Sequence, residues 1–248
     1  MRYLFSRDGG RALEELANEQ TLCAFDFDGT LAPIAQHPEQ AKMRAATRRL
    51  LRETSKLYPC VVISGRARTD VIAKLDGVGV DRVFGNHGAE SERTIADGRK
   101  ARKWKTALRR TLRGMEGVWI EDKDLSLAVH YRQAADRAEA GRRIREAVNE
   151  LKGVRWFGGK MVVNVVEEQA RDKGDALLAE RKRTGCDWAI YVGDDQNDED
   201  AFGAENVVSV RVGRKPGSRA GYYLRSQKEI DELLSRLIAE RKTGRAAD

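Results

Sequence analysis

The segment 22–30 reads LCAFDFDGT and decides how the rest of the chain is interpreted. Its first half is a short apolar run, which is typical of a β-strand buried on both faces. The run leads into Asp26, Phe27 and Asp28, and the alternation of side chains along a strand places both aspartates on the same side. Gly29 allows a sharp turn after them. A solvated turn is the simpler interpretation of these residue types, and other parts of the sequence decide between the two.

Four other short apolar runs alternate with charged segments that have a helical pattern. Near-continuous apolar strands that alternate with helices are typical of a parallel sheet covered on both faces. We therefore predict an α/β fold whose core is a Rossmann-like parallel sheet. The predicted strands of this sheet are Leu22–Phe27, Cys60–Ser64, Val83–Gly85, Trp188–Asp194 and Val207–Gly213.

The middle of the sequence has a different pattern. A helical segment followed by two strand-like runs occurs there twice, an order typical of α+β folds built from hairpins. We therefore predict a smaller α+β domain at 93–167, inserted into a core formed by 1–92 and 168–248. The second hairpin is expected to turn at Gly158-Gly159. The predicted elements of the inserted domain are helices at 99–115 and 135–151 and strands at 118–123, 126–132, 154–159 and 161–166.

The charge of the chain is uneven. Its 248 residues include 46 Lys and Arg against 39 Asp and Glu, a net charge of +7. The segment 93–167 carries a net charge of +8 and the remainder −1, so the excess belongs to the predicted insertion. Such an excess suits a nucleic acid, an anionic membrane surface or a phosphorylated small molecule. Aromatic residues make up only 6%, which is little for the stacking of bases.

The cysteines and the N-terminal segment suggest the compartment. Cys23, Cys60 and Cys186 are far apart and form no CxxC pair, so we expect buried free thiols in a reducing environment. The first residues have no apolar stretch of the kind found in secretory signals, and no apolar run is long enough to cross a bilayer. We expect a soluble, cytoplasmic monomer that binds neither a membrane nor a nucleic acid.

A second acidic segment changes the interpretation of the first. The apolar strand at 188–192 runs into the sequence GDDQNDED at 193–200. Carboxylates crowded at the end of a buried strand are electrostatically costly unless a cation binds among them. Ligands gather at the carboxyl ends of strands in open α/β sheets, and oxygen ligands suit Mg²⁺. The two acidic strand ends therefore predict a magnesium site.

Two more residues complete a predicted phosphate site. Ser64 ends a strand at the start of an expected helix, whose N-terminal backbone N–H groups suit a phosphate. Lys173 lies where a later helix begins and can place its charge on a phosphoryl oxygen. Taken singly, Ser64 is a plain helix cap and Lys173 a surface lysine. Their order along the chain, together with both acidic segments, favours phosphate chemistry.

The chemistry follows from charge. A carboxylate that attacks a phosphate dianion is repelled unless positive groups and hydrogen-bond donors neutralise the phosphoryl oxygens. Mg²⁺, Lys173 and the Ser64 hydroxyl would do so. Asp26 is then the expected nucleophile, which forms an aspartyl-phosphate. Asp28 is the expected general acid for the leaving oxygen and the general base for water.

The ordered set DFDGT, ISGR, Lys173 and GDDQNDED resembles the four motifs of the haloacid dehalogenase superfamily of phosphatases. The resemblance implies that Asp26 is the nucleophile and Asp28 the acid and base. It also implies that Mg²⁺ is bound by the Asp26 carboxylate, the Asp28 carbonyl and Asp194. Asp195 and Asp198 are implied as supporting acids of the metal site.

A narrower resemblance extends over most of the chain. The segments DFDGTLAPIAQHPEQA, GNHGAE, EDKDLSLAVHYR and GDDQNDEDAF are similar to the trehalose-6-phosphate phosphatase family. That resemblance implies an inserted α/β cap that determines substrate specificity, with trehalose 6-phosphate hydrolysed to trehalose and phosphate. The sugar phosphate is then expected to contact an E-x-K pair of the cap, other cap residues and the entrance of the core. These substrate-binding candidates are Gly65, Arg66, His87, Glu121, Lys123, Lys160 and Asn164.

Two positions depart from the family pattern. Asn164 occupies a position where the family has a glutamate that recognises sugar, and Asn197 occupies one where the family has threonine. An asparagine can accept a hydrogen bond from a hydroxyl but supplies no charge. A related phosphatase for another glycosyl phosphate, such as sucrose phosphate or mannosyl-phosphoglycerate, is therefore an alternative. A nucleic-acid or anionic-surface binder is the alternative from another class, and it leaves the acidic strand ends unexplained.

Overall fold

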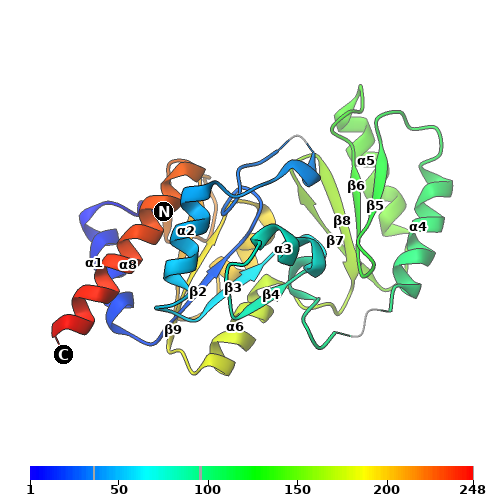
Figure 1. Ribbon diagram of the computed structural model, residues 1–248. Coiled ribbons are helices and arrows are strands. Elements are labelled where there is room, and N and C mark those ends of the chain that lie inside the picture. The colour runs from blue at the N-terminus through cyan, green and yellow to red at the C-terminus, as the bar shows by residue number, and fades with distance from the viewer. Residues whose placement is uncertain (36, 95–96, 248) are drawn as a thin grey trace. The chain divides into compact units, whose positions relative to one another are not determined.

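A computed structural model describes residues 1–35, 37–94 and 97–247. The chain divides into two compact units, whose elements are drawn in Figure 1. The core unit consists of Met1–Ser91, Asp172–Asp194 and Asp198–Asp248. The inserted unit consists of Glu92–Arg171 together with Asp195–Asn197.

The core unit contains a seven-stranded sheet in the order β1-β11-β10-β9-β2-β3-β4, and every neighbouring pair in it is parallel. This sheet confirms the predicted α/β fold class. Each of the five predicted strands is present and ends one or two residues earlier than expected. The two outer strands β1 and β11 were not predicted, because runs of two and three residues are too short to show a pattern. The strands are β1 (Arg2–Tyr3), β2 (Thr21–Phe25), β3 (Cys60–Ile63), β4 (Arg82–Phe84), β9 (Trp188–Gly193), β10 (Val207–Val212) and β11 (Tyr222–Leu224).

The order of the strands reverses at the centre of this sheet. From β2 the chain proceeds outward through β3 and β4, and from β9 it proceeds outward in the other direction through β10 and β11. β2 and β9 are direct neighbours, with Phe25 opposite Val192 in the register. The carboxyl ends of the strands on either side of such a reversal form a crevice where ligands bind in α/β proteins. Asp26 and Asp194 directly follow these two strand ends.

Helices cover both faces of the core sheet because alternate strand residues are apolar on either side. One face, which includes Phe25 and Val192, packs against α1, α2, α3 and α8. The other, which includes Ala24 and Tyr191, packs against α6 and α7. Cys23, Cys60 and Cys186 are free and buried, as expected from the sequence. The helices are α1 (Arg7–Asn18), α2 (Ala45–Thr54), α3 (Arg68–Leu75), α6 (Lys173–Thr184), α7 (Glu199–Phe202) and α8 (Ile230–Ala247), and short 3₁₀ turns span Pro38–Gln40, Asn86–Gly88, Gln196–Asp198 and Gln227–Glu229.

The inserted unit has an antiparallel sheet in the order β5-β6-β8-β7. Trp104 and Leu108 of one helix and Ile144 of the other pack against Leu127 and Val165 on one face of this sheet. The helix–strand–strand order occurs twice, as the sequence pattern predicts. The elements are α4 (Arg99–Thr111), β5 (Trp119–Asp122), β6 (Leu127–His130), α5 (Arg137–Asn149), β7 (Val154–Gly159) and β8 (Val162–Glu167).

The turn of the second hairpin differs from the prediction. Gly158 and Gly159 belong to β7, where they lie opposite Val163 and Val162. The turn is made by the two residues that follow, Lys160 and Met161, and Met161 adopts a left-handed backbone with φ 63°. The Gly-Gly prediction was wrong because glycine is only one of the residues that occupy tight turns, and the pairing of β7 with β8 determines where the strands end.

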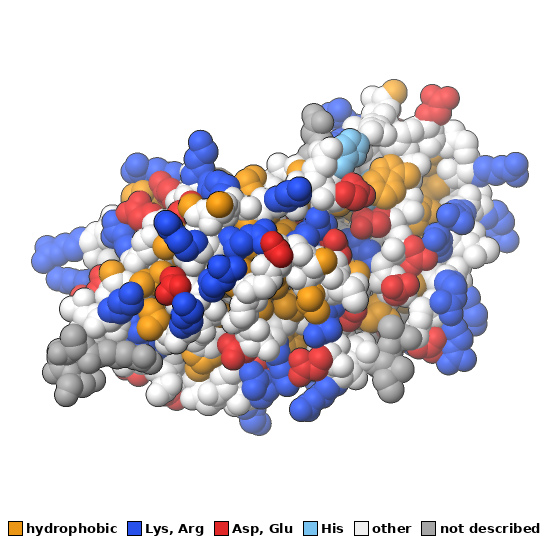
Figure 2. Space-filling model, viewed as in Figure 1, with side chains coloured by type: hydrophobic (Ala, Val, Ile, Leu, Met, Phe, Trp, Pro, Cys, Tyr) orange, Lys and Arg blue, Asp and Glu red, His pale blue; other side chains and the backbone are white. Residues whose placement is uncertain are grey.

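The basic excess of the inserted unit is concentrated on α4. Figure 2 shows Lys and Arg side chains gathered over this helix, while its apolar residues Trp104 and Leu108 are buried in the unit's own core. Within the described residues, the helices are too short or too polar to span a bilayer. The exposed basic residues of α4 are Arg99, Lys100, Arg102, Lys103, Arg109 and Arg110.

Adjacent leucines on α6 provide a matched test of the packing. Leu177 is fully buried beneath the sheet, whereas Leu178 is 37% exposed. Leu177→Ala is expected to lower the free energy of unfolding by about 2–5 kcal/mol, since it leaves a cavity as well as removing apolar contact. Leu178→Ala should cost less than about 1 kcal/mol. Urea unfolding followed by circular dichroism measures both, and equal losses would contradict the packing of α6 described above.

Candidate active site

A buried lysine joins the ends of the two central strands. The Lys173 ammonium donates to Oδ1 of Asp26 at 2.7 Å and to Oδ1 of Asp198 at 2.7 Å. Asp26 follows β2, Asp198 ends the 3₁₀ turn after β9, and Lys173 is the first residue of α6. The Lys173 side chain is only 1% exposed. The structure thus brings together three sequence-predicted residues that are far apart along the chain.

The first turn of α6 is fixed by a capping box. The Asp172 carboxylate accepts a hydrogen bond from the backbone N–H of Asp175 at 2.9 Å, and the Asp175 carboxylate accepts one from the N–H of Asp172 at 3.2 Å. These two bonds satisfy N–H groups that the start of a helix leaves without intrahelical partners. Lys173 is therefore oriented by a well-formed helix start.

Three buried carboxylates form a group at this sheet edge. Ligand oxygens of Asp26, Asp194 and Asp198 all lie within 4.8 Å of one another. Burial raises the pKa of Asp26 well above its ordinary value, Lys173 opposes this effect, and the charges of Asp198 and Asp194 add to it. Burial alone would lower the pKa of Lys173, but the charges and hydrogen bonds of Asp198 and Asp26 outweigh it and raise that pKa. The carboxylates thus hold Lys173 as a cation, while Asp26 carries an unfavourable charge.

The donor set fits a divalent cation. One lysine charge cannot neutralise three carboxylates, and the remaining negative charge is buried. The chain also approaches the group closely, because a Cβ added at Gly29 would lie 2.2 Å from Oδ2 of Asp194. Hard oxygen ligands and excess negative charge are what Mg²⁺ requires. Within the described residues this group comprises Asp26, Asp194 and Asp198, so the predicted ligand Asp195 lies outside it.

Two residues that the sequence analysis missed hold the acidic loop in place. The Tyr191 hydroxyl donates to Oδ1 of Asp198 at 2.7 Å, and Nη2 of Arg211 donates to the backbone carbonyl of Asp194 at 2.5 Å. Arg211 also pairs with Glu199 at 3.0 Å. The sequence gives no sign that Tyr191 has this role, because an aromatic residue is common in an apolar strand such as β9. Arg211 gave a signal, since it is the charged residue of a strand, β10, whose other residues are valines and one serine.

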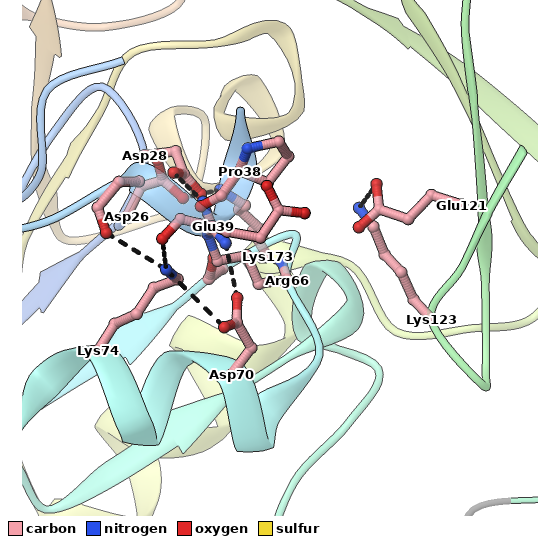
Figure 3. Close-up of polar contacts among 12 residues, drawn as sticks. Asp26, Asp28, Pro38, Glu39, Arg66, Asp70, Lys74, Glu121, Lys123 and Lys173 are labelled. Atoms are coloured by element: carbon pink, nitrogen blue, oxygen red, sulfur yellow. Dashed lines mark hydrogen bonds and ion pairs between the residues drawn. The ribbon is translucent and has the colours of Figure 1, made fainter. Parts of the chain in front are cut away.

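Asp28 is more accessible than Asp26 and has a different partner. Its side chain is 35% exposed, against 7% for Asp26. Nε and Nη2 of Arg66 donate to the two carboxylate oxygens of Asp28 at 2.6 and 2.7 Å. Nη1 of Arg66 donates to Asp70 of α3 at 2.6 Å, and Figure 3 shows these side chains pointing toward one another. Arg66, predicted to bind substrate, is thus placed against the predicted acid and base.

Ser64 and Gly65 follow the end of β3, and His87 lies in the 3₁₀ turn that follows the neighbouring strand β4. Ser64 is fully buried, and its hydroxyl accepts from the backbone N–H of Arg66 at 3.2 Å. His87 is also buried, and its backbone N–H donates to the backbone carbonyl of Ser64 at 2.9 Å. A Cβ added at Gly65 would lie 2.4 Å from the imidazole of His87, so this position requires glycine. The three predicted residues are therefore in mutual contact.

The predicted residues of the inserted unit lie mainly on one sheet face. Glu121 and Lys123 come from β5 and the segment after it, and their charged atoms are 3.9 Å apart (Figure 3). Asn164 of β8 is buried and pairs with Ala128, which in turn pairs with Glu121, so Glu121 and Asn164 share a face. Lys160 is exposed in the hairpin turn.

A stacked pair of rings borders the Glu121 carboxylate. Trp119 stacks on His130 with ring centroids 4.0 Å apart, and Nε2 of His130 lies 2.8 Å from Oε2 of Glu121. Trp119 is 44% exposed. No sequence pattern predicts this arrangement, because residues on neighbouring strands meet only through the register of β5 and β6.

Comparison with known proteins assigns this geometry to a family. A family model described as trehalose-phosphatase matches residues 24–218. The chain is 28% identical over 238 residues to probable trehalose-phosphate phosphatase 4 of Oryza sativa subsp. japonica, a match that covers 86% of this chain and 64% of that protein. The chain thus spans slightly less than two thirds of the length of this relative.

Solved structures show the same fold. The trehalose-6-phosphate phosphatase C-terminal domain of C. albicans has a TM-score of 0.79 and 23% identity, with 93% of this chain and 96% of that chain covered. BT1666 of Bacteroides thetaiotaomicron, described among the phosphatases of the haloalkanoate (HAD) enzyme superfamily, has a TM-score of 0.64 and 16% identity, with 89% of this chain and 96% of that chain covered. The core sheet and its acidic strand ends therefore define a protein with the haloacid dehalogenase fold.

Because the family model matches most of the chain, this protein belongs to the trehalose-phosphatase family. The resemblance inferred from the sequence motifs is thereby confirmed at the level of the family.

The raised pKa of Asp26 leads to a pH-dependent stability difference. In the presence of a metal chelator, the wild-type protein is expected to lose stability as the pH rises from 3.8, the ordinary pKa of an aspartate, toward the higher pKa of Asp26 in the folded protein. Asp26→Asn does not titrate, so its thermal midpoint should rise relative to wild type as the pH increases. Thermal unfolding of both proteins at about pH 4 and about pH 7 measures the difference. At the lower pH the two should be similar, and a difference that shrinks with rising pH would contradict the assignment.

Proposed function

We propose that this protein is a Mg²⁺-dependent phosphatase that hydrolyses trehalose 6-phosphate to trehalose and phosphate. The observation that carries the proposal is the Lys173 ammonium, buried between Asp26 and Asp198 beside Asp194. A phosphoryl group needs a nucleophile, positive charge around its oxygens and a means of proton transfer. The residues at this sheet edge can supply all of these, and membership of the trehalose-phosphatase family supports the choice of substrate.

In the first half of the proposed reaction, a carboxylate oxygen of Asp26 attacks phosphorus. The bond between phosphorus and the sugar oxygen breaks, its electron pair stays on that oxygen, and the Asp28 carboxyl gives the oxygen a proton. Trehalose leaves and Asp26 carries the phosphoryl group. Lys173 orients Asp26 and offsets negative charge, while the Ser64 side chain and neighbouring backbone N–H groups bind phosphoryl oxygens.

In the second half, ionised Asp28 takes a proton from water, and the water oxygen attacks the phosphorus of the aspartyl-phosphate. The bond to Asp26 breaks, its electron pair returns to the carboxylate, and inorganic phosphate leaves. Asp28 is then protonated for the next cycle, so atoms and charge balance over the two steps.

We propose Asp26, Asp194 and Asp198 as the carboxylates that hold or support Mg²⁺, with the Asp28 carbonyl as a further ligand and Asp195 as an outer acid. A divalent cation bound there would neutralise charge on the transferring phosphoryl group. The close approach of the three carboxylate groups and their burial support this assignment.

The inserted segment, predicted at 93–167, is proposed to be a cap that recognises the sugar. Glu121, Lys123 and Asn164 present polar groups that can bind hydroxyls, and Lys160 is a further candidate in the hairpin turn. His87 and Gly65 are the proposed contacts of the core, whereas the guanidinium of Arg66 is engaged by Asp28 and Asp70. Asn164 stands where the family has a glutamate. Another glycosyl phosphate is therefore the alternative substrate.

A panel of sugar phosphates tests the proposed function. The highest kcat/KM is expected for trehalose 6-phosphate, compared with sucrose phosphate and mannosyl-phosphoglycerate, when inorganic phosphate release is measured with Mg²⁺ present. Asp26→Asn should reduce turnover below detection, which shows that the activity belongs to this site. A higher kcat/KM for another sugar phosphate would overturn the substrate, and full activity in Asp26→Asn would overturn the nucleophile.

Metal binding is testable without turnover. Saturating Mg²⁺ at about 100 times its dissociation constant stabilises a folded protein by about 2.7 kcal/mol, which for a chain of this size raises the thermal midpoint by roughly 5–10 °C. The rise should be lost in Asp194→Asn and retained in Asp8→Asn, whose carboxylate lies on α1. NaCl of equal ionic strength is the control, and an equal rise in Asp194→Asn would contradict the proposed ligand.

A further inference from the structure

The guanidinium of Arg66 is held on three sides by acceptors of the core unit. It makes two hydrogen bonds to Asp28, one to Asp70 and one, from Nη2 at 2.7 Å, to the backbone carbonyl of Pro38. The side chain is only 11% exposed and lies over the ring of Phe27, with 5.7 Å between the guanidinium carbon and the ring centroid. A guanidinium with four such hydrogen bonds is fixed in position and plane.

A second cation, Lys74, extends the same network. Its ammonium donates to the carbonyls of Glu39 and Ala41 at 3.1 and 3.3 Å, and lies 3.9 Å from Asp70. Asp70 and Lys74 are four residues apart on α3 and so occupy the same face of that helix. Figure 3 shows both side chains extending from α3 toward Arg66 and the segment around Pro38. The network therefore ties Asp28 to a rigid helix.

The two parallel hydrogen bonds from Arg66, here called the fork, leave Asp28 able to transfer protons. Each carboxylate oxygen of Asp28 accepts one N–H from Arg66, and a carboxylate oxygen has capacity for a second hydrogen bond. Two parallel bonds fix the plane of the carboxylate, so the direction of the remaining lone pairs is also fixed. A single bond would leave the carboxylate free to rotate.

We propose that Arg66, held by Asp70, is the positioning residue that aims Asp28 at the reacting oxygens. This inference rests on the proposed function and assigns Arg66 a role different from direct contact with the sugar phosphate. Asp70 and Lys74 then act through Arg66 and touch no substrate.

Hydrolysis of p-nitrophenyl phosphate separates the two roles. Its leaving group departs without a proton, so kcat/KM reports attack by Asp26, whereas the hydrolysis of the phosphoenzyme still needs Asp28 as a base. Arg66→Lys keeps the charge and loses the fork. We expect kcat to fall by about tenfold to a hundredfold and KM to fall with it, since the misplaced base slows only the second half.

The phosphoenzyme provides an independent readout. Acid quenching followed by mass spectrometry should detect phosphate on the Asp26 peptide at a higher level in Arg66→Lys than in wild type. Asp70→Asn should change kcat, KM and phosphoenzyme level in the same direction by a smaller factor. Asp8→Asn is the matched control, because Asp8 also lies in the first turn of a helix and pairs with an arginine, Arg2, at 3.1 Å. It should leave all three quantities unchanged.

A double-mutant cycle completes the test. In an Asp28→Asn background, Arg66→Lys should have no further effect on kcat, because the residue that it positions is gone. A fall in kcat/KM with a raised KM and no phosphoenzyme would overturn the proposal and assign Arg66 to substrate binding. A wild-type protein that neither hydrolyses phosphate esters nor forms a phosphoenzyme would instead contradict the proposed function, and this role of Arg66 with it.

Discussion

The core unit depends on one buried cation, the Lys173 ammonium that lies between Asp26 and Asp198. Buried ions cost several kcal/mol to desolvate, so the ammonium is stable here only together with the carboxylates that accept its hydrogen bonds. Here the three partners come from the end of β2, the start of α6 and the turn after β9. They meet only when β2 and β9 are neighbours and α6 covers the sheet. The charged site therefore forms only when the core unit has folded.

Much of this architecture could be predicted from the sequence because the signals are local. Apolar runs of four to six residues ending in Asp or Ser predicted β2, β3 and β9, and two of them carry the acids that the structure brings together. The chain order of Asp26, Ser64, Lys173 and Asp194 added information that no single residue holds. Parallel strands share one carboxyl edge, and this rule converts distant sequence positions into spatial neighbours.

The remainder depends on which side chains meet across elements, and pattern alone does not determine that. The family resemblance implied that Arg66 contacts the substrate, yet its hydrogen bonds go to Asp28, Asp70 and the carbonyl of Pro38. Asp70 and Lys74 look like an ordinary exposed helix pair until the fold brings α3 against the segment after β2. The Tyr191 hydroxyl is equally hidden in an apolar strand, since its partner Asp198 lies in the following turn.

The capping box of α6 has a consequence for how such chains diversify. The inserted unit returns to the core unit at Asp172, directly before the lysine on which the site depends. Two hydrogen bonds between Asp172 and Asp175 cap the start of the helix. Both bonds are local and involve no residue before Asp172. An insertion of different length or sequence can therefore be exchanged without shifting the register of the ammonium. The junction thus makes the start of α6, and with it the position of Lys173, independent of the sequence that precedes residue 172.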